Sequence, residues 1–281
     1  MSEPTDTNQD GRTPLVRIER HGPATVLTLD RPDALNAFTN AMVDELHRAV
    51  VQAVADPEVV GIIITGAGRG FCAGLDASAL AFTTEGANTG GSTRDVADDD
   101  RLAGLFSFLV EQPKPIIAAV NGVAAGGGFV LAAKCDLRFA SVDASFVTIF
   151  SKRGLIAEHG LTWLLPRQIG TGDALDLLWS SRRIDAAEAH RVGLVQAVVP
   201  ADQLVDHAIA YVHDLAEHVS PTSLAVTKRL VYGQLGADMA EAFTEADDAT
   251  WEGVEHPDAT EGARAYIERR PPRFERVGGT T

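Results

Sequence analysis

Two glycine-rich turns, each directly after an apolar run, are the features of this sequence that could do chemistry. The first is IIITGAGRGFCAGLD, residues 62–76, and the second is IIAAVNGVAAGGGFV, residues 116–130. A tight strand-to-helix turn would be a sufficient structural reason for either motif alone. Together they predict backbone N–H groups that converge at the carboxyl ends of neighbouring strands, where open α/β sheets bind ligands. Two such groups beside a helix N-terminus form an oxyanion hole, which stabilises negative charge on a carbonyl oxygen.

Several other kinds of site have no support in the sequence. The stretch GAGRGFCAG is not a dinucleotide-binding loop, because the sixth position from Gly66 is Phe71 instead of glycine. The G-x-S-x-G, H-E-x-x-H and P-loop patterns are absent. The two cysteines, Cys72 and Cys135, have no metal-ligand spacing, and we predict that they are reduced and buried thiols.

The charge of the chain limits its partners. The 281 residues carry a formal net charge of −15 at pH 7, which argues against nucleic acid or an anionic membrane as the main partner. A phosphorylated ligand held in one local basic pocket stays compatible with this charge. No stretch approaches the ~18 apolar residues of a membrane span, and the polar start MSEPTDTNQDGRT is unlike a secretory signal. We therefore expect a cytoplasmic protein.

The elements that must position the glycine turns alternate between strand and helix patterns. Thr39 is expected to cap a helix that ends before Asp56 and Pro57. This alternation predicts an α/β domain built from βα units. Apolar runs predict strands at 15–20, 24–30, 59–66, 115–120 and 137–140.

The sequence changes character near residue 200. Residues 1–13 are predicted to be a disordered head, and residues 14–200 to form the core that holds the site. Residues 201–281 carry helical periodicity and are predicted to form a helical C-terminal oligomerisation region. Within the core, the polar stretch 83–100 is predicted to be a mobile lid or binding loop, because loops of this length are uncommon in compact domains.

The glycine turns belong to a longer pattern that resembles the crotonase (enoyl-CoA hydratase/isomerase) superfamily over roughly residues 14–275. The resemblance implies a spiral of ββα units followed by a helical C-terminal trimerisation region, with a homotrimer or a dimer of trimers as the assembly. It also implies an acyl-CoA thioester as substrate, without a separate cofactor, and oxyanion amides on Leu75 and Gly127. The segments that carry it are LDRPDALNAF, GRGFCAGLD, KPIIAAVNGVAAGGGFVLAAKCDLRFAS, LPRQIG, AAEAHRVGLVQAVV, SLAVTKRL and PDATEGARAYIERRPPRF.

The acid–base residues depart from the pattern of the hydratases in this superfamily. Those hydratases carry two glutamates, and the matching positions here are Val130 and, in a gap-free match, Phe150. Neither side chain can activate water, so a two-glutamate hydration is not expected. Val130, Phe150 and the later His159 are instead expected to line the substrate pocket.

Glu158 stands eight residues beyond Phe150 and is the candidate catalytic base. The stretch TIFSKRGLIAEHGLTW is similar to the active-site segment of the 3-enoyl-CoA to 2-enoyl-CoA isomerases, whose catalytic glutamate matches Glu158. The same position holds the nucleophilic aspartate of the 4-chlorobenzoyl-CoA dehalogenases. The alternative is that Glu158 only caps a helix that begins near Gly160.

The resemblance also implies contacts to the rest of the coenzyme A group. Backbone groups at Ala34, Ala73 and Asp76 would meet the adenine, and Arg31 would approach the phosphates. Lys228 would belong to the rim of the coenzyme A site. A solvated surface position is the alternative for each basic side chain, because a lone basic residue is weak evidence of phosphate binding.

These residues lead us to expect an acyl-CoA enzyme in which Leu75 and Gly127 stabilise a thioester enolate. Double-bond isomerisation suits the single base Glu158, because one carboxylate can take a proton from one carbon and return it two carbons away. The alternatives are an enoyl-CoA hydratase or an acyl-CoA hydrolase that uses Glu158, and a non-catalytic acyl-CoA-binding relative. Val130 and Phe150 favour the non-catalytic relative, whereas Glu158 argues against it.

Overall fold

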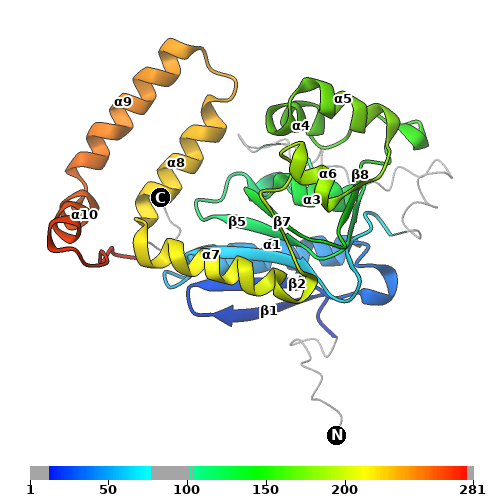
Figure 1. The fold of residues 1–281 in the computed structure, drawn as a ribbon, viewed down its shortest axis with the longest axis horizontal. Helices are drawn as coiled ribbons and strands as arrows, with labels where there is room; N and C mark the ends of the chain where they lie inside the picture. The colour runs from blue at the N-terminus through cyan, green and yellow to red at the C-terminus, as the bar shows by residue number, and fades with distance from the viewer. Residues whose placement is uncertain (1–12, 77–101, 103, 277–281) are drawn as a thin grey trace, which may run out of the picture.

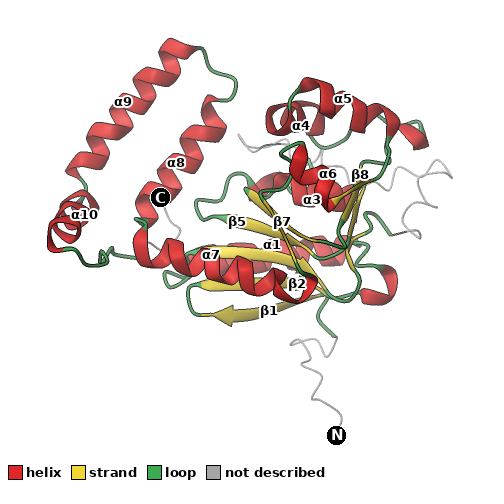
Figure 2. Ribbon diagram, in the orientation of Figure 1, coloured by secondary structure: helices red, strands yellow, loops and turns green. Residues whose placement is uncertain are grey.

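Two sheets form the core of the protein, and Figures 1 and 2 show them with the helices around them. The structure, a computed structural model, describes residues 13–76, 102 and 104–276. The larger sheet has the strand order β1-β2-β3-β5-β7-β10, and the smaller sheet has the order β4-β6-β8-β9. The predicted disordered head, apart from residue 13, and the predicted loop 83–100 lie outside the described residues.

The larger sheet is parallel except at one edge, where β1 runs antiparallel to β2. The strands predicted at 15–20, 24–30, 59–66, 115–120 and 137–140 correspond to β1, β2, β3, β5 and β7, so all five are confirmed. The bounds are β1 (Val16–His21), β2 (Ala24–Leu29), β3 (Gly61–Gly66), β5 (Ile116–Val120), β7 (Leu137–Ser141) and β10 (Ala197–Val199).

The smaller sheet consists of short strands that follow the longer ones. Strands β4, β6 and β8 lie parallel to one another, and β9 runs antiparallel to β8. Runs of two or three residues are too short to show an alternating pattern, so the sequence does not predict these strands. Their bounds are β4 (Gly70–Cys72), β6 (Val123–Ala125), β8 (Ser145–Val147) and β9 (Ile184–Asp185). The pairs β3-β4, β5-β6 and β7-β8 build the expected spiral of ββα units, and the α/β fold class is confirmed.

Helix α1 (Asn40–Ala55) begins and ends where the sequence predicts. The hydroxyl oxygen of Thr39 accepts a hydrogen bond from the N–H of Met42 at 3.3 Å, and Asp56 follows the last helical residue. The remaining helices of the core are α3 (Gly127–Lys134), α4 (Leu161–Ile169), α5 (Thr171–Ser180), α6 (Ala186–Arg191) and α7 (Leu204–His218). Short 3-10 turns lie at Pro32–Ala34 (η1), Ser107–Leu109 (η3), Ser151–Arg153 (η4) and Ala201–Gln203 (η5).

The central strands of the larger sheet are buried on both faces. Ile62 and Ile64 of β3 belong to a cluster that includes residues of α1 and α3, while Ile63 belongs to a second cluster on the opposite face. All three isoleucine side chains are fully buried. Each buried side chain of this size contributes roughly 1.5–3 kcal/mol, so this alternation fixes the position of β3 between two layers.

Helix α7 covers the second face of the larger sheet, as Figure 1 shows. Its residues Leu204, Ala208 and Val212 are buried in the second cluster, beside Ile63 and Phe139 of the sheet. The sequence groups this helix with the C-terminal region because of its helical periodicity. In the structure α7 is part of the core, and the helices that leave the core begin at residue 221.

Helices α8 (Pro221–Gln234), α9 (Met239–Glu255) and α10 (Pro257–Glu268) form an arm that extends away from the sheets in Figures 1 and 2. Neither α8 nor α9 contains a buried residue. Among the helices in the described ranges, none is long and apolar enough to cross a membrane.

Candidate active site

The two glycine turns meet at the start of α3. Gly74 follows β4 with φ +93°, a left-handed conformation that glycine adopts without strain. A Cβ atom on Gly74 would lie 2.7 Å from the carbonyl oxygen of Ala125 and 3.2 Å from the nitrogen of Gly127. The structure thus brings the predicted amides of Leu75 and Gly127 into one place.

Backbone hydrogen bonds of the described residues leave both of these amides unused. Leu75 is flanked by two backbone hydrogen bonds, from Phe38 N to Gly74 O at 2.8 Å and from Asp76 N to Phe38 O at 3.1 Å. Gly127 is the first residue of α3, and the first N–H groups of a helix have no acceptor within it. Within the described part of the chain, no backbone oxygen accepts a hydrogen bond from the N–H of Leu75 or of Gly127.

The close packing of α3 against β4 requires the glycine that follows. A Cβ atom on Gly128 would overlap the carbonyl oxygen of Cys72. Cys72 and Cys135 are both buried, as predicted, and burial raises the pKa of each thiol to about 12. Neither cysteine is therefore a thiolate near neutral pH, and their role here is packing.

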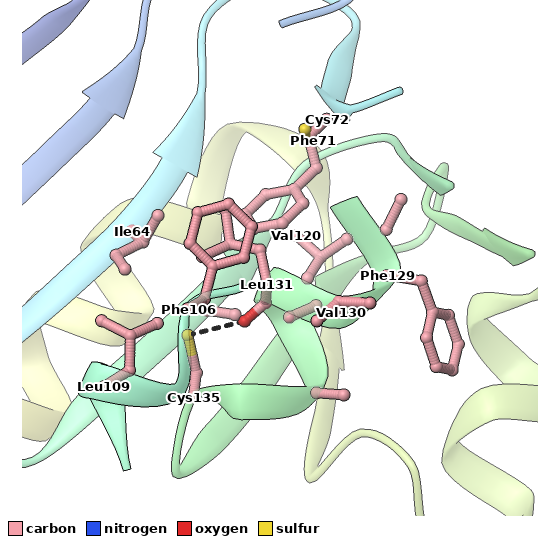
Figure 3. Packing of buried hydrophobic residues seen from close by; sticks show 14 of the residues in the cluster. Ile64, Phe71, Cys72, Phe106, Leu109, Val120, Phe129, Val130, Leu131 and Cys135 are labelled. Carbon is pink, nitrogen blue, oxygen red and sulfur yellow. Dashed lines mark hydrogen bonds between the residues drawn. The ribbon is translucent and has the colours of Figure 1, made fainter. Parts of the chain in front are cut away.

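The positions that match the hydratase glutamates are apolar and buried. Val130 is 0% exposed and Phe150 is 5% exposed. Figure 3 shows Val130 among the packed side chains of the core, on the same helix as Leu131. Neither position offers a polar atom that could move a proton.

Glu158 lies in the connection between η4 and α4, and its side chain is 39% exposed. Burial raises the pKa of this carboxyl group above its ordinary value of 4.5. Its backbone oxygen accepts a hydrogen bond from Leu161 at 3.2 Å. Among the described groups, no backbone N–H donates to the carboxylate of Glu158, so the helix-cap alternative has no hydrogen bond to support it.

His159 is placed to face the carboxylate of Glu158. Its Nδ1 accepts a hydrogen bond from the backbone N–H of Leu105 at 3.1 Å, so the neutral ring carries its proton on Nε2. Nε2 lies 3.4 Å from Oε2 of Glu158. Burial and the nearby charge of Lys134 lower the pKa of His159, which favours the neutral ring.

Leu105 lies between the Glu158–His159 pair and the amides of Leu75 and Gly127, and the sequence gives no signal for this position. A Cβ atom on Gly127 would lie 3.7 Å from Cδ2 of Leu105, and a Cβ atom on Gly104 would lie 3.2 Å from Cα of His159. Residues 104 and 105 therefore lie against both Gly127 and His159. This contact places Glu158 in the same region as the amide pair.

Lys134 and Ser107 are two further polar residues near this region. Lys134 is the last residue of α3, and its ammonium group donates to the Ser107 hydroxyl oxygen at 2.6 Å. Both residues are buried. The available signal was a lysine in an otherwise apolar helix, four residues after Val130.

The residues predicted to meet the adenine and the phosphates lie around one turn beside Leu75. Nη2 of Arg31 lies 2.8 Å from Oδ2 of Asp76, so the predicted phosphate ligand is in an ion pair. The N–H of Ala73 donates to the carbonyl oxygen of Leu35 at 3.0 Å, and Ala34 ends η1. A phosphate would have to compete with Asp76 for the guanidinium group.

Lys228 lies inside the molecule. Its ammonium group lies 2.7 Å from Oδ2 of Asp136 and also donates to the carbonyl oxygens of Leu109 and Lys114, both at 3.2 Å. The side chain is 10% exposed. These bonds attach α8 to the core, and they give no support to the predicted contact with coenzyme A.

Comparisons with known proteins identify the family. The chain matches the family described as "Enoyl-CoA hydratase/isomerase" over residues 19–277. A protein of Rhodobacter capsulatus named "Probable enoyl-CoA hydratase" is 35% identical over 259 residues, which cover 92% of this chain and 97% of that protein. 

Solved structures show the same fold. The structure of an enoyl-CoA hydratase from Mycobacterium tuberculosis superposes with a TM-score of 0.81 and 32% identity, and covers 93% of this chain and 98% of its own. The structure of an enoyl-CoA hydratase from Bacillus anthracis superposes with a TM-score of 0.83 and 28% identity, and covers 93% and 99%. From its sequence match, its fold and its paired glycine turns, this chain belongs to the enoyl-CoA hydratase/isomerase family of the crotonase superfamily.

Proposed function

We propose that this chain isomerises an enoyl-CoA ester, with its thioester oxygen bound by the amides of Leu75 and Gly127 and with Glu158 as the single acid and base. The observation that carries the proposal is the pair of buried apolar residues, Val130 and Phe150, at the two usual glutamate positions. A partly exposed carboxylate, Glu158, lies instead in the same region as the amides.

The proposed reaction needs one group that moves a proton, Glu158, and one oxyanion hole that stabilises the enolate. Glu158 takes a proton from C2 of a 3-enoyl-CoA, and the electron pair of that C–H bond moves into an enolate whose charge lies on the thioester oxygen. The double bond shifts as the same carboxyl group returns the proton to C4, which gives the 2-enoyl-CoA. Loss of one oxyanion donor typically lowers the rate of such a step ~100- to 1000-fold, so the two amides carry much of the catalysis.

His159 supports the ionised form of Glu158 in this mechanism. Because Leu105 holds Nδ1 as an acceptor, the Nε2–H group faces the carboxylate. A donor beside a carboxylate favours its charged form, and this acts against the burial that raises the pKa of Glu158. His159 is therefore a positioning residue for the base.

A second candidate is hydration of a 2-enoyl-CoA with Glu158 as the base that activates water. The names of the relatives favour this reaction. In that case the chain would use one carboxylate where the two-glutamate hydratases use two. The rate of crotonyl-CoA hydration should then exceed the rate of 3-enoyl-CoA isomerisation in the same enzyme preparation.

The test is the substitution Glu158→Gln, which keeps the shape of the side chain but removes the base. We expect isomerisation of a 3-enoyl-CoA, followed by absorbance, to fall ~100-fold or more. Affinity for a saturated acyl-CoA should stay within a few-fold, because the amides and the coenzyme A contacts are unchanged. Glu19→Gln, an exposed glutamate on β1, is the matched control and should leave the rate unchanged.

Each outcome separates the candidates. A wild-type enzyme that hydrates crotonyl-CoA faster than it isomerises 3-hexenoyl-CoA, and loses hydration in the variant, would replace isomerisation with hydration. An unchanged isomerisation rate in Glu158→Gln would show that Glu158 is not the base. Acyl-CoA binding without proton exchange at C2 in deuterated water would favour the non-catalytic relative.

A further inference from the structure

The ammonium group of Lys134 is buried, and the residues that the structure describes supply no counter-ion in contact with it. The residue is 6% exposed, and its one hydrogen-bond partner in the described residues is the neutral hydroxyl group of Ser107, at 2.6 Å. No carboxylate of the described ranges lies within 4 Å of the ammonium nitrogen. An ammonium group has three N–H donors, so two of them have no acceptor among the described residues.

The elements packed around Lys134 do not supply the missing charge. Burial lowers the pKa of Lys134, and Glu111, which follows η3, opposes this shift electrostatically but forms no ion pair with the amine. His159, which precedes α4, has a lowered pKa and adds no negative charge. Burying a charge without a partner is unfavourable, so a group outside these elements is expected to compensate it.

Lys134 lies on the side of α3 that faces the candidate active site. It follows Val130 by four residues, so the two side chains project from the same face of the helix. A Cβ atom on Gly160 would lie 3.8 Å from Nζ of Lys134, and Gly160 is two residues beyond Glu158. Seven residues of helix separate Gly127 from Lys134, a rise of about 10 Å. The ammonium group therefore lies beside the turn that follows Glu158, one length of α3 away from Gly127.

There is room for a ligand group at this point. Lys134, Ser107 and Gly160 line a cavity of about 1290 Å³ whose wall also includes the apolar residues Leu102, Val110 and Leu164. Leu75, Gly127 and Glu158 do not line it, so Lys134 lies between the catalytic region and this space. The same wall carries Lys114, Lys228, Arg229 and Arg276 beside the one carboxylate of Glu111, and this excess of cations suits an acyl chain that ends in an anion.

We propose that the ammonium group of Lys134 binds a carboxylate at the far end of the acyl chain, so that the preferred substrates are CoA monoesters of dicarboxylic acids. This inference rests on the proposed function, because it takes the acyl chain to start at the amides of Leu75 and Gly127. The second carboxylate of the substrate acts as the counter-ion of Lys134, and its oxygens accept hydrogen bonds from the two remaining N–H groups of the ammonium.

Binding of saturated CoA esters tests the inference without a chemical step. Octanoyl-CoA and suberyl-CoA have acyl chains of equal length that end in a methyl group and in a carboxylate, and calorimetry gives the affinity for each. We expect the wild-type protein to bind suberyl-CoA at least ~10-fold more tightly than octanoyl-CoA. Hexanoyl-CoA with adipyl-CoA, and decanoyl-CoA with sebacyl-CoA, determine the chain length that fits best.

The variants Lys134→Met and Lys134→Gln remove the charge, and both should abolish or reverse the preference for the carboxylate. Methionine fills a similar volume, and replacing a buried charge with an apolar residue is often tolerated, so a folded variant is expected. Lys134→Gln retains hydrogen-bonding groups and separates the effect of charge from that of polarity. Lys152→Met, at an exposed lysine of η4, is the control and should keep the wild-type ratio.

Three results would overturn the inference. Equal affinity for the methyl-ended and carboxylate-ended esters in every chain-length pair would show that the wild-type protein does not recognise the second carboxylate. If Lys134→Met still preferred the carboxylate-ended ester, another residue would have to bind the second carboxylate. If Lys134→Met left the preference unchanged but weakened self-association in light scattering, the missing anion would belong to a second copy of the chain. Failure of the wild-type protein to bind any of these esters would instead refute the proposed function itself.

Discussion

At the scale of single residues, partial burial and the neighbouring ring of His159 act in opposite directions on the protonation of Glu158. Partial burial favours the neutral acid and raises its pKa above 4.5. We propose that the Nε2–H group of His159, which lies 3.4 Å from Oε2, opposes this shift and favours the carboxylate. A base must be ionised to accept a proton, so the rate should fall as pH decreases through a value above 4.5.

In the pH profile of kcat/KM, the decline at low pH reports the protonation of Glu158. We expect His159→Ala to move this acidic limb to higher pH, because loss of the donor raises the pKa of Glu158 further. The rate at neutral pH should fall on the order of 10- to 100-fold, since the carboxylate also loses its orientation. His159→Gln places an amide N–H at a similar reach and should restore most of the rate. A lower melting temperature with an unmoved limb in His159→Ala would show that His159 only supports the local backbone.

At the scale of elements, the attachment of α8 to the core depends on a partly buried polar cluster. Oδ2 of Asp136 lies 2.7 Å from the ammonium group of Lys228, and the same oxygen accepts the N–H of Ile116 at 2.7 Å. Oδ1 of Asp136 accepts the hydroxyl group of Tyr232 at 3.1 Å. Asp136 precedes β7 directly, so its carboxylate joins α8 to β5 and to the start of β7.

We expect Lys228→Met to lower the free energy of unfolding by about 3–5 kcal/mol, because it leaves Asp136 as an uncompensated buried charge. Affinity for acyl-CoA below the melting temperature should stay within a few-fold. Arg229→Met is a matched control from the next residue, since the exposed pair of Arg229 with Glu245 contributes less than ~1 kcal/mol. Chemical denaturation and calorimetry measure the two quantities. Lost affinity with unchanged stability would instead support the predicted contact of Lys228 with coenzyme A.

At the scale of the whole molecule, the arm leaves large apolar side chains uncovered. On α9, the exposed fractions are 77% for Met239, 73% for Phe243 and 64% for Trp251. On α10 they are 88% for Tyr266 and 79% for Ile267. Monomeric proteins rarely expose large apolar patches, so a second copy of the chain is expected to cover this arm.

We expect light scattering at micromolar concentration to return a homotrimer or a dimer of trimers. The double substitution Phe243→Glu and Trp251→Glu places two charges in the expected interface and should yield a monomer. Ile18→Glu changes an exposed apolar residue of β1 outside the arm and should leave the assembly intact. A monomeric wild-type protein would refute the predicted assembly.

The sequence by itself determined the features that are encoded within a few neighbouring residues. The buried strands follow from continuous apolar runs, and the ends of α1 follow from Thr39 and Asp56. The glycine turns predicted the meeting of Leu75 and Gly127, because only glycine permits such close backbone contacts. The ordered motifs also identified the family.

Only the tertiary structure decided which partner each long polar side chain has and which surface each helix covers. Lys228 lies beside Asp136, which is 92 residues away in the sequence, and Lys134 lies beside Ser107, which is 27 residues away. The apolar face of α7 is visible in the sequence, but its position on the sheet follows from packing against β3, β5 and β7. Local patterns carry no record of such contacts, because they depend on how distant segments are brought together by the fold.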